Sequence, residues 1–299
     1  MRFMPWCISF PEKVFFMPPI RALTRDQLIS IEALSIRAGN AIMDVRLRGV
    51  ERTDKADGSP VTEADLAADR IIREGLEEIA PGIPAITEET YKGHDDTEAE
   101  QYWCVDPLDG TKGFINGGRD FTVNIALIRY RAPALGVIYA PATGELWAGM
   151  DGMATKRETG PSPNQTLEAM GEARPISARR AEITHPHIVA TKAHRGPALE
   201  AWIERLNAAE NVAVGSSLKF CVIAEGKADL YPRIGPTMEW DTAAGQAIVE
   251  AAGGSVIGPD GNAFMYGKPG RLNGYFAAMA SLDGTPPSEW VPPREGGDD

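Results

Sequence analysis

Three groups of acidic residues follow apolar segments of the chain and have the side chains for metal-dependent chemistry. They are Glu88-Glu89, Asp106 with Asp109, and Asp241. Each comes at the end of an expected strand or the start of an expected helix, and sites in layered α/β proteins form at strand ends. Carboxylates without a cluster of histidines or cysteines favour Mg²⁺ over Zn²⁺. Two such ions can polarise a phosphoryl group, make a water nucleophilic and stabilise the leaving oxygen.

The sharpest motif is Asp-Pro-Leu-Asp-Gly-Thr-Lys, which begins at Asp106. Its proline stiffens the turn, so Asp106 and Asp109 can face one ion. Gly110 lets the backbone come close to a ligand. If a helix begins here, the amides of Gly110 and Thr111 make an anion site. Taken alone, the motif also fits a simple turn.

The elements that must position these residues alternate along the first half. A helix is expected over 24–45, because Thr24 and Gln27 fit a capping box. A second is expected over 62–79, with Asp65 completing the cap at Thr62. The expected strands cover 83–87, 102–105, 121–130, 134–140 and 145–149. The strand at 102–105 is apolar without alternation, which predicts cover on both faces.

The second half alternates strands with helices. Strands are expected at 188–191, 212–214, 228–231 and within 255–280, and helices at 197–209, 216–226 and 241–252. The stretch 156–174 contains prolines and is expected to link the halves. The predicted organisation is a leader at 1–20, an N-terminal half at 21–158 that carries the metal site, a C-terminal α/β half at 159–285, and a loose tail at 286–299.

Composition limits the classes of function. The chain has 299 residues and a formal net charge of −12. This charge argues against a polymeric nucleic acid or an anionic membrane as partner. No apolar run reaches the roughly 20 residues of a membrane span, and prolines break the apolar N-terminus, so a secretory signal is disfavoured. Three cysteines at no metal spacing suit reduced thiols in the cytoplasm.

Two long motifs resemble the signatures of the inositol monophosphatase superfamily. Residues 103–114 resemble its first signature, and residues 240–254 resemble its second. They stand in the family's order, with a Glu-Glu pair upstream. The resemblance covers roughly residues 24 to 282 and implies the layered αβαβα sugar-phosphatase fold.

Within the superfamily, the chain is most similar to the CysQ-type 3′(2′),5′-bisphosphate nucleotidases. The similarity lies in residues 121–127, 135–141, 215–221 and 224–233. The chain departs from this branch in its leader, in Gly113-Phe114 where Glu-Phe is common, and in the long segment 156–174. None of these departures touches an expected ligand.

The resemblance implies a ligand set for two to three Mg²⁺ ions. The set comprises Glu88, Asp106, Asp109, Asp241 and the main-chain oxygen of Leu108. Asp65 would hold a third, weaker ion through water or help position the nucleophile, and Thr111 would bind the nucleophilic water or the phosphate. Asp65, Thr111 and Glu88 would thus be the catalytic residues. The alternative is that Asp241 and Asp65 only cap helices.

The implied reaction is hydrolysis of adenosine 3′,5′-bisphosphate to AMP and phosphate, with the sulfated nucleotide PAPS, giving APS, as a second substrate. The retained phosphate needs cations outside the metal site. The expected substrate contacts are Gly110, Thr111, His194, Ser216, Lys219, Arg233 and Asp241. Lys219 and Arg233 could instead be solvated surface charges. If a helix begins near Gly215-Ser216, its amides also favour an anion.

Two other readings remain open. The chain could be a phosphatase of the same superfamily that acts on inositol monophosphate, histidinol phosphate or fructose 1,6-bisphosphate. It could also be an inactive protein that senses a nucleotide. The resemblance further implies inhibition by Li⁺, a role in sulfate assimilation and a cytoplasmic location, with loose attachment to the inner membrane as the alternative. Both a monomer and a homodimer are compatible with the sequence.

Overall fold

The computed structural model describes residues 23–50, 52–54, 60–93, 99–190 and 196–293. The expected leader at 1–20 and His194 lie outside these ranges. Within them, no helix is long and apolar enough to cross a membrane. The first half contains α1 (Arg25–Arg48), β1 (Arg52–Asp54), β2 (Pro60–Thr62), α2 (Glu63–Ile79), β3 (Ala85–Thr87), β4 (Gln101–Asp109), α3 (Thr111–Ile115), β5 (Thr122–Arg129), β6 (Ala132–Ala140), β7 (Glu145–Met150), β8 (Met153–Glu158) and β9 (Arg174–Ile176).

The described part of the second half contains short strands, three α-helices and two short 3₁₀ helices. They are β10 (His187–Ala190), α4 (Pro197–Arg205), β11 (Glu210–Ala213), α5 (Leu218–Ala224), β12 (Leu230–Arg233), β13 (Thr237–Met238), α6 (Glu239–Ala251), β14 (Ser255–Ile257), η1 (Pro269–Arg271), β15 (Leu272–Asn273), β16 (Phe276–Met279) and η2 (Ser288–Trp290). The symbol η marks a 3₁₀ helix.

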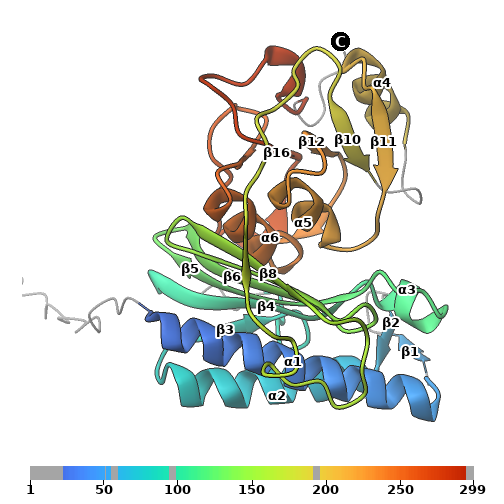
Figure 1. Cartoon of the computed structure of the whole chain (residues 1–299), viewed down its shortest axis with the longest axis vertical. Coiled ribbons are helices and arrows are strands. Elements are labelled where there is room, and N and C mark those ends of the chain that lie inside the picture. Colours follow the sequence, from blue (N-terminus) through green and yellow to red (C-terminus); the bar gives the residue numbers. More distant parts are fainter. Residues whose placement is uncertain (1–22, 51, 55–59, 94–98, 191–195, 294–299) are drawn as a thin grey trace, which may run out of the picture.

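These elements stack in the five layers that the sequence predicts. Helices α1 and α2 cover one face of a seven-stranded sheet, α5 and α6 cover its other face, and a five-stranded sheet and α4 follow (Figure 1). The large sheet has the order β3-β4-β5-β6-β7-β8-β9, and the smaller one has the order β11-β10-β12-β16-β14. The αβαβα expectation is therefore confirmed.

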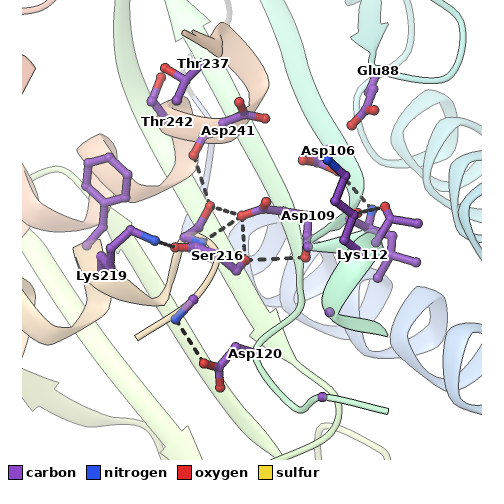
Figure 2. Close-up of a pocket in the computed structure, with 18 of the residues that line it drawn as sticks. Glu88, Asp106, Asp109, Lys112, Asp120, Ser216, Lys219, Thr237, Asp241 and Thr242 are labelled. Atoms are coloured by element: carbon purple, nitrogen blue, oxygen red, sulfur yellow. Dashed lines mark hydrogen bonds between the residues drawn. The ribbon is translucent and has the colours of Figure 1, made fainter. Parts of the chain in front are cut away.

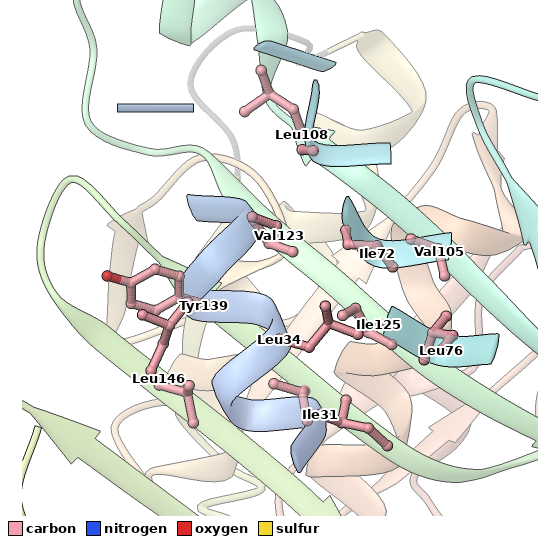
Figure 3. Close-up of a cluster of buried hydrophobic side chains, with 14 of the residues drawn as sticks. Ile31, Leu34, Ile72, Leu76, Val105, Leu108, Val123, Ile125, Tyr139 and Leu146 are labelled. Atoms are coloured by element: carbon pink, nitrogen blue, oxygen red, sulfur yellow. The ribbon is translucent and has the colours of Figure 1, made fainter. Parts of the chain in front are cut away.

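Two apolar cores lie on opposite faces of the large sheet. Leu34 and Ile72, from the two long helices, pack against Val105 and Ile125 of the sheet (Figure 3). On the other face, Cys104 packs with residues of α5 and α6. Because side chains alternate along a strand, β4 contributes to both cores. This explains why its sequence is apolar without alternation.

Helix α6 packs closely on the large sheet at two glycines. A Cβ atom at Gly136 would lie 2.3 Å from the main-chain oxygen of Ala244, and one at Gly149 would lie 2.7 Å from Cα of Ile248. Side chains at these positions would push the helix away from the sheet. The glycines therefore set the height at which α6 lies on β6 and β7.

Two expectations about connecting segments differ from the structure. The stretch 156–174 is bounded by strands, because β8 and β9 pair with each other at the edge of the large sheet. The predicted boundary at 158/159 thus falls inside one sheet. The tail from 286 is also anchored over its described part: Trp290 is buried in the core beside α4, and Trp202 Nε1 donates to the main-chain oxygen of Glu289 at 2.7 Å.

Candidate active site

Asp106, Asp109 and Asp241 line one cavity and converge there. Each offers a carboxylate oxygen, and these oxygens lie within 4.8 Å of one another. Asp106 and Asp109 end β4, where the β4–β5 pairing shifts between them. Asp241 lies in the first turn of α6, where its carboxylate accepts from the amide of Met238 at 2.8 Å. Asp241 therefore caps its helix and joins the cluster, so the two alternatives do not exclude each other.

The cluster concentrates negative charge at buried and half-buried positions. Burial raises the pKa of Asp106 well above its usual range, and the charges of Glu88 and Asp109 add to this effect. Burial and the charge of Asp109 raise the pKa of Asp241 to about 8. Carboxylates held this close need either protons or a cation. The hard oxygen donors and their spacing fit a divalent ion such as Mg²⁺.

Glu88 lines the same cavity from outside the three-carboxylate cluster. Figure 2 shows it on the Asp106 side of the site. Leu108 also lines the cavity, and its main-chain oxygen accepts from the hydroxyl of Thr111 at 3.0 Å. Both residues therefore line the cavity that the three aspartates border.

Asp65 reaches the site through Thr111. Its Oδ2 accepts from the amide and the hydroxyl of Thr62, both at 2.7 Å, which forms the capping box of α2. Its Oδ1 accepts from the hydroxyl of Thr111 at 3.1 Å. Burial raises the pKa of Asp65 against the effect of these hydrogen bonds. One carboxylate oxygen of Asp65 thus completes the cap of α2, and the other binds Thr111, which lines the cavity.

Ser216, an expected substrate contact, and its neighbour Ser217 both bind Asp109. The hydroxyl of Ser216 and both the hydroxyl and the amide of Ser217 donate to Asp109 Oδ2. Helix α5 begins at Leu218 rather than near Gly215, and the Gly215 amide donates to Asp120 Oδ2 at 2.9 Å. The anion site expected at the start of a helix near Gly215-Ser216 is therefore not formed, because α5 begins later and Asp120 occupies the Gly215 amide.

Two cations from the second half line the cavity beside these serines. Lys219 is 5% exposed, and its ammonium group donates to the main-chain oxygen of Ser216 at 2.6 Å. Burial lowers its pKa to about 8. Arg233 donates through Nη2 to the oxygen of Pro236 at 3.3 Å, while its buried Nε has no partner in the described part of the chain. Lys219 is therefore not the solvated surface charge of the alternative reading.

The turn after β4 approaches the segment 118–121 closely. Gly110 has a φ of 94°, and a Cβ atom there would lie 2.8 Å from the main-chain oxygen of Asp120. A larger residue would be strained in its backbone conformation and would clash with the main-chain oxygen of Asp120. Helix α3 begins at Thr111 directly after this glycine, as expected if a helix starts there.

The cavity has a volume of about 930 Å³ and includes residues that the sequence did not single out. Among them are Lys112, Arg119, Asp120, Tyr231, Thr237 and Thr242. Lys112 lies inside the first motif, so the sequence could have indicated that it lines the site. Tyr231 and Thr242 lie within 224–233 and 240–254, two segments that carry the resemblance. Arg119, Asp120 and Thr237 join them only through the fold, and Figure 2 shows Asp120 and Thr237 at the same cavity.

Comparison with known proteins places this geometry in a family. The model of the inositol monophosphatase family matches residues 24–280. The chain is 43% identical to the 3′(2′),5′-bisphosphate nucleotidase CysQ of Shigella flexneri over 226 residues, which cover 75% of this chain and 87% of the relative. It is 39% identical to CysQ of Buchnera aphidicola over 274 residues, which cover 89% of this chain and 99% of the relative.

A solved structure agrees with these relatives. The crystal structure of CysQ from Bacteroides thetaiotaomicron is 34% identical, with a TM-score of 0.70, and the match covers 86% of this chain and 98% of that one. The carboxylate cluster, the layer order and these matches agree. This chain belongs to the inositol monophosphatase family.

Proposed function

We propose that this protein is a Mg²⁺-dependent 3′(2′),5′-bisphosphate nucleotidase. It would hydrolyse the 3′-phosphate of adenosine 3′,5′-bisphosphate to give AMP and phosphate. The observation that carries the proposal is a single cavity with the three clustered carboxylates on one side and the cations Lys219 and Arg233 on another. Such a cavity can hold one phosphate at bound metal and a second phosphate at the cations. Relatives named as this enzyme, at 39–43% identity, support the assignment.

The three clustered aspartates, Glu88 and the Leu108 oxygen would hold the ions. When bound, the ions would neutralise phosphate charge and make a water nucleophilic. Thr111 would orient that water, and Asp65 would accept a proton through the Thr111 hydroxyl, since its raised pKa suits a general base. Lys219 and Arg233 would bind the phosphate that is retained. His194 remains an expected contact to the nucleotide.

We also propose a cytoplasmic location. Cys104 and Cys221 are buried and free. Free thiols suit a reducing compartment.

The test is phosphate release from adenosine 3′,5′-bisphosphate, PAPS, inositol 1-phosphate, histidinol phosphate and fructose 1,6-bisphosphate. Each is assayed with Mg²⁺, with EDTA and with added Li⁺, beside Asp109→Asn. We expect Mg²⁺-dependent cleavage of the nucleotides above the other substrates. Faster cleavage of inositol 1-phosphate would overturn the substrate assignment, and release in EDTA would overturn the role of the metal.

A matched pair of lysine variants tests the phosphate pocket. Lys219→Met removes the buried cation, whereas Lys227→Met removes a lysine whose side chain is 58% exposed and pairs with Glu225. We expect Lys219→Met to raise KM for the nucleotide roughly tenfold to a hundredfold, as for a lost charged hydrogen bond. Lys227→Met should leave KM unchanged. Equal KM values for all three proteins would exclude Lys219 from the pocket.

A further inference from the structure

Asn124 lies next to the carboxylate cluster, and neither the motifs nor the resemblance gives it a role. It is on β5, directly opposite Asp106 of β4 in the antiparallel pairing. Opposite residues of such a pair project from the same face of the sheet. Asn124 is 1% exposed. A polar side chain in this position needs partners, and those partners lead to the metal site.

The amide of Asn124 reaches two of the three clustered aspartates through one hydroxyl. Its Nδ2 donates to Ser217 Oγ at 2.8 Å. Ser217 Oγ in turn lies 2.7 Å from Asp109 Oδ2 and 3.0 Å from the main-chain oxygen of Asp241. A hydroxyl has one proton to give. Because the Asn124 amide donates to it, that proton is directed toward Asp109 or Asp241.

Ser217 Oγ therefore lies within hydrogen-bond distance of two acceptor oxygens that belong to different elements. Asp109 ends β4, whereas Asp241 lies in the first turn of α6, and Ser217 precedes α5. Three separate segments therefore meet at one hydroxyl group. The Oδ1 atom of Asn124 is buried and has no hydrogen-bond partner among the described residues. An unsatisfied acceptor is unfavourable. The hydrogen bond that the nitrogen of the same amide donates to Ser217 is therefore the reason for an asparagine at this position.

We propose that Asn124 is a positioning residue, which fixes the Asp109 carboxylate and the first turn of α6 that carries Asp241 for divalent-ion binding, by orienting the hydroxyl of Ser217. The inference rests on the proposed metal-dependent function. Asn124 does not contact the ion or the substrate in this account. Its contribution is to the geometry of the carboxylate cluster, so its loss should change metal affinity more than the rate of the chemical step.

A double-mutant cycle tests the proposal in the full-length protein. Mn²⁺ and Mg²⁺ affinity is measured by calorimetry for wild type, Asn124→Ala, Ser217→Ala and the double variant. We expect each single change to weaken binding roughly tenfold to a hundredfold, the usual effect of residues that orient metal ligands. The double variant should be no weaker than Ser217→Ala, because Asn124 acts through that hydroxyl. Additive losses would overturn the proposal.

The kinetic readout separates positioning from general damage. At saturating Mg²⁺, kcat of Asn124→Ala should return to within about threefold of wild type, while the Mg²⁺ concentration for half-maximal rate rises. The control is Gln246→Ala on α6, another amide that is 1% exposed; its Nε2 donates to Glu250 and to the Phe264 oxygen. This control should lower the melting temperature without changing metal affinity. An equal loss of affinity in Gln246→Ala would overturn the proposal.

Two further outcomes have distinct meanings. If Asn124→Ala does not fold, Asn124→Ser takes its place in the cycle, with the same expectation. If wild type binds neither Mn²⁺ nor Mg²⁺, the proposed function fails and this inference fails with it. If wild type binds the ions and the variants bind them equally well, only the role of Asn124 is refuted.

Discussion

The hydroxyl of Thr111 donates to Oδ1 of Asp65 at 3.1 Å, across 46 positions of the sequence. The other oxygen of Asp65 completes the cap of α2. The start of a helix on one face of the large sheet is thereby tied to the motif at the end of β4. A residue that looks like an ordinary cap in the sequence also borders the site.

Asp65→Ala should lower both stability and rate. Loss of the cap should cost about 1 kcal/mol of unfolding free energy, and loss of the contact with Thr111 should lower kcat about 10²-fold or more. Gln27→Ala is the matched control, because Gln27 holds the equivalent position in the capping box of α1. Gln27→Ala should lower the unfolding free energy by a similar amount, as measured by denaturant unfolding, and should leave kcat unchanged in steady-state kinetics. Equal kcat in both variants would limit Asp65 to capping.

The pH dependence of nucleotide hydrolysis should reflect Lys219. Burial lowers the pKa of this lysine to about 8, so its ammonium form is present below pH 8 and disappears above it. With a charged lysine binding the retained phosphate, kcat/KM for adenosine 3′,5′-bisphosphate should fall above about pH 8. The measurement is a profile from pH 6 to 10. Lys219→Met should lack this inflection, and so should wild type acting on inositol 1-phosphate.

Mg²⁺ should stabilise the protein more at pH 8 than at pH 6. Without metal, the raised pKa values of Asp106 and Asp241 mean that the folded state binds more protons than the unfolded state between about pH 4 and 8. Stability without metal therefore falls as pH rises through this range. Mg²⁺ competes with those protons, so its binding strengthens in the same direction.

Thermal melts in Mg²⁺ and in EDTA at both pH values check this expectation. An ion present at 100 times its Kd adds about 2.7 kcal/mol. Asp109→Asn should show a smaller shift at each pH. A shift that is larger at pH 6 would contradict the charge argument.

Trp290→Ala should destabilise the second half strongly. The side chain is 1% exposed and packs with Leu199 and Trp202. Truncating a buried tryptophan costs about 3–5 kcal/mol, which denaturant unfolding would detect. Val291→Ala, at a neighbouring half-buried position, should cost much less. A loss below about 1 kcal/mol for Trp290→Ala would restore the expectation of a loose tail.

Local signals in the sequence predicted local structure well. Thr24 with Gln27, and Thr62 with Asp65, form the two capping boxes that the residue types suggest. The apolar run before Asp106 is a strand covered on both faces. These features depend on neighbours within a few positions, so residue type and spacing were sufficient to predict them.

Features that depend on distant partners were not predictable in this way. Ser217 and Asp109 are 108 positions apart, and nothing near Ser217 indicates that its amide would meet a carboxylate. Similarly, the prolines after residue 160 suggested a linker, while pairing with β8 makes 174–176 a strand. A strand at a sheet edge gains its structure from the neighbour it pairs with, which its own sequence does not reveal.

Helix α6 bears Asp241 and lies against the two glycines of β6 and β7. It also packs with α5 and the smaller sheet, so it belongs to the interior of both halves. The halves therefore cannot swing apart as rigid bodies without separating Asp241 from Asp106 and Asp109. We expect ligand exchange to depend on loops at the rim, and ion binding to be lost in the first cooperative step of unfolding.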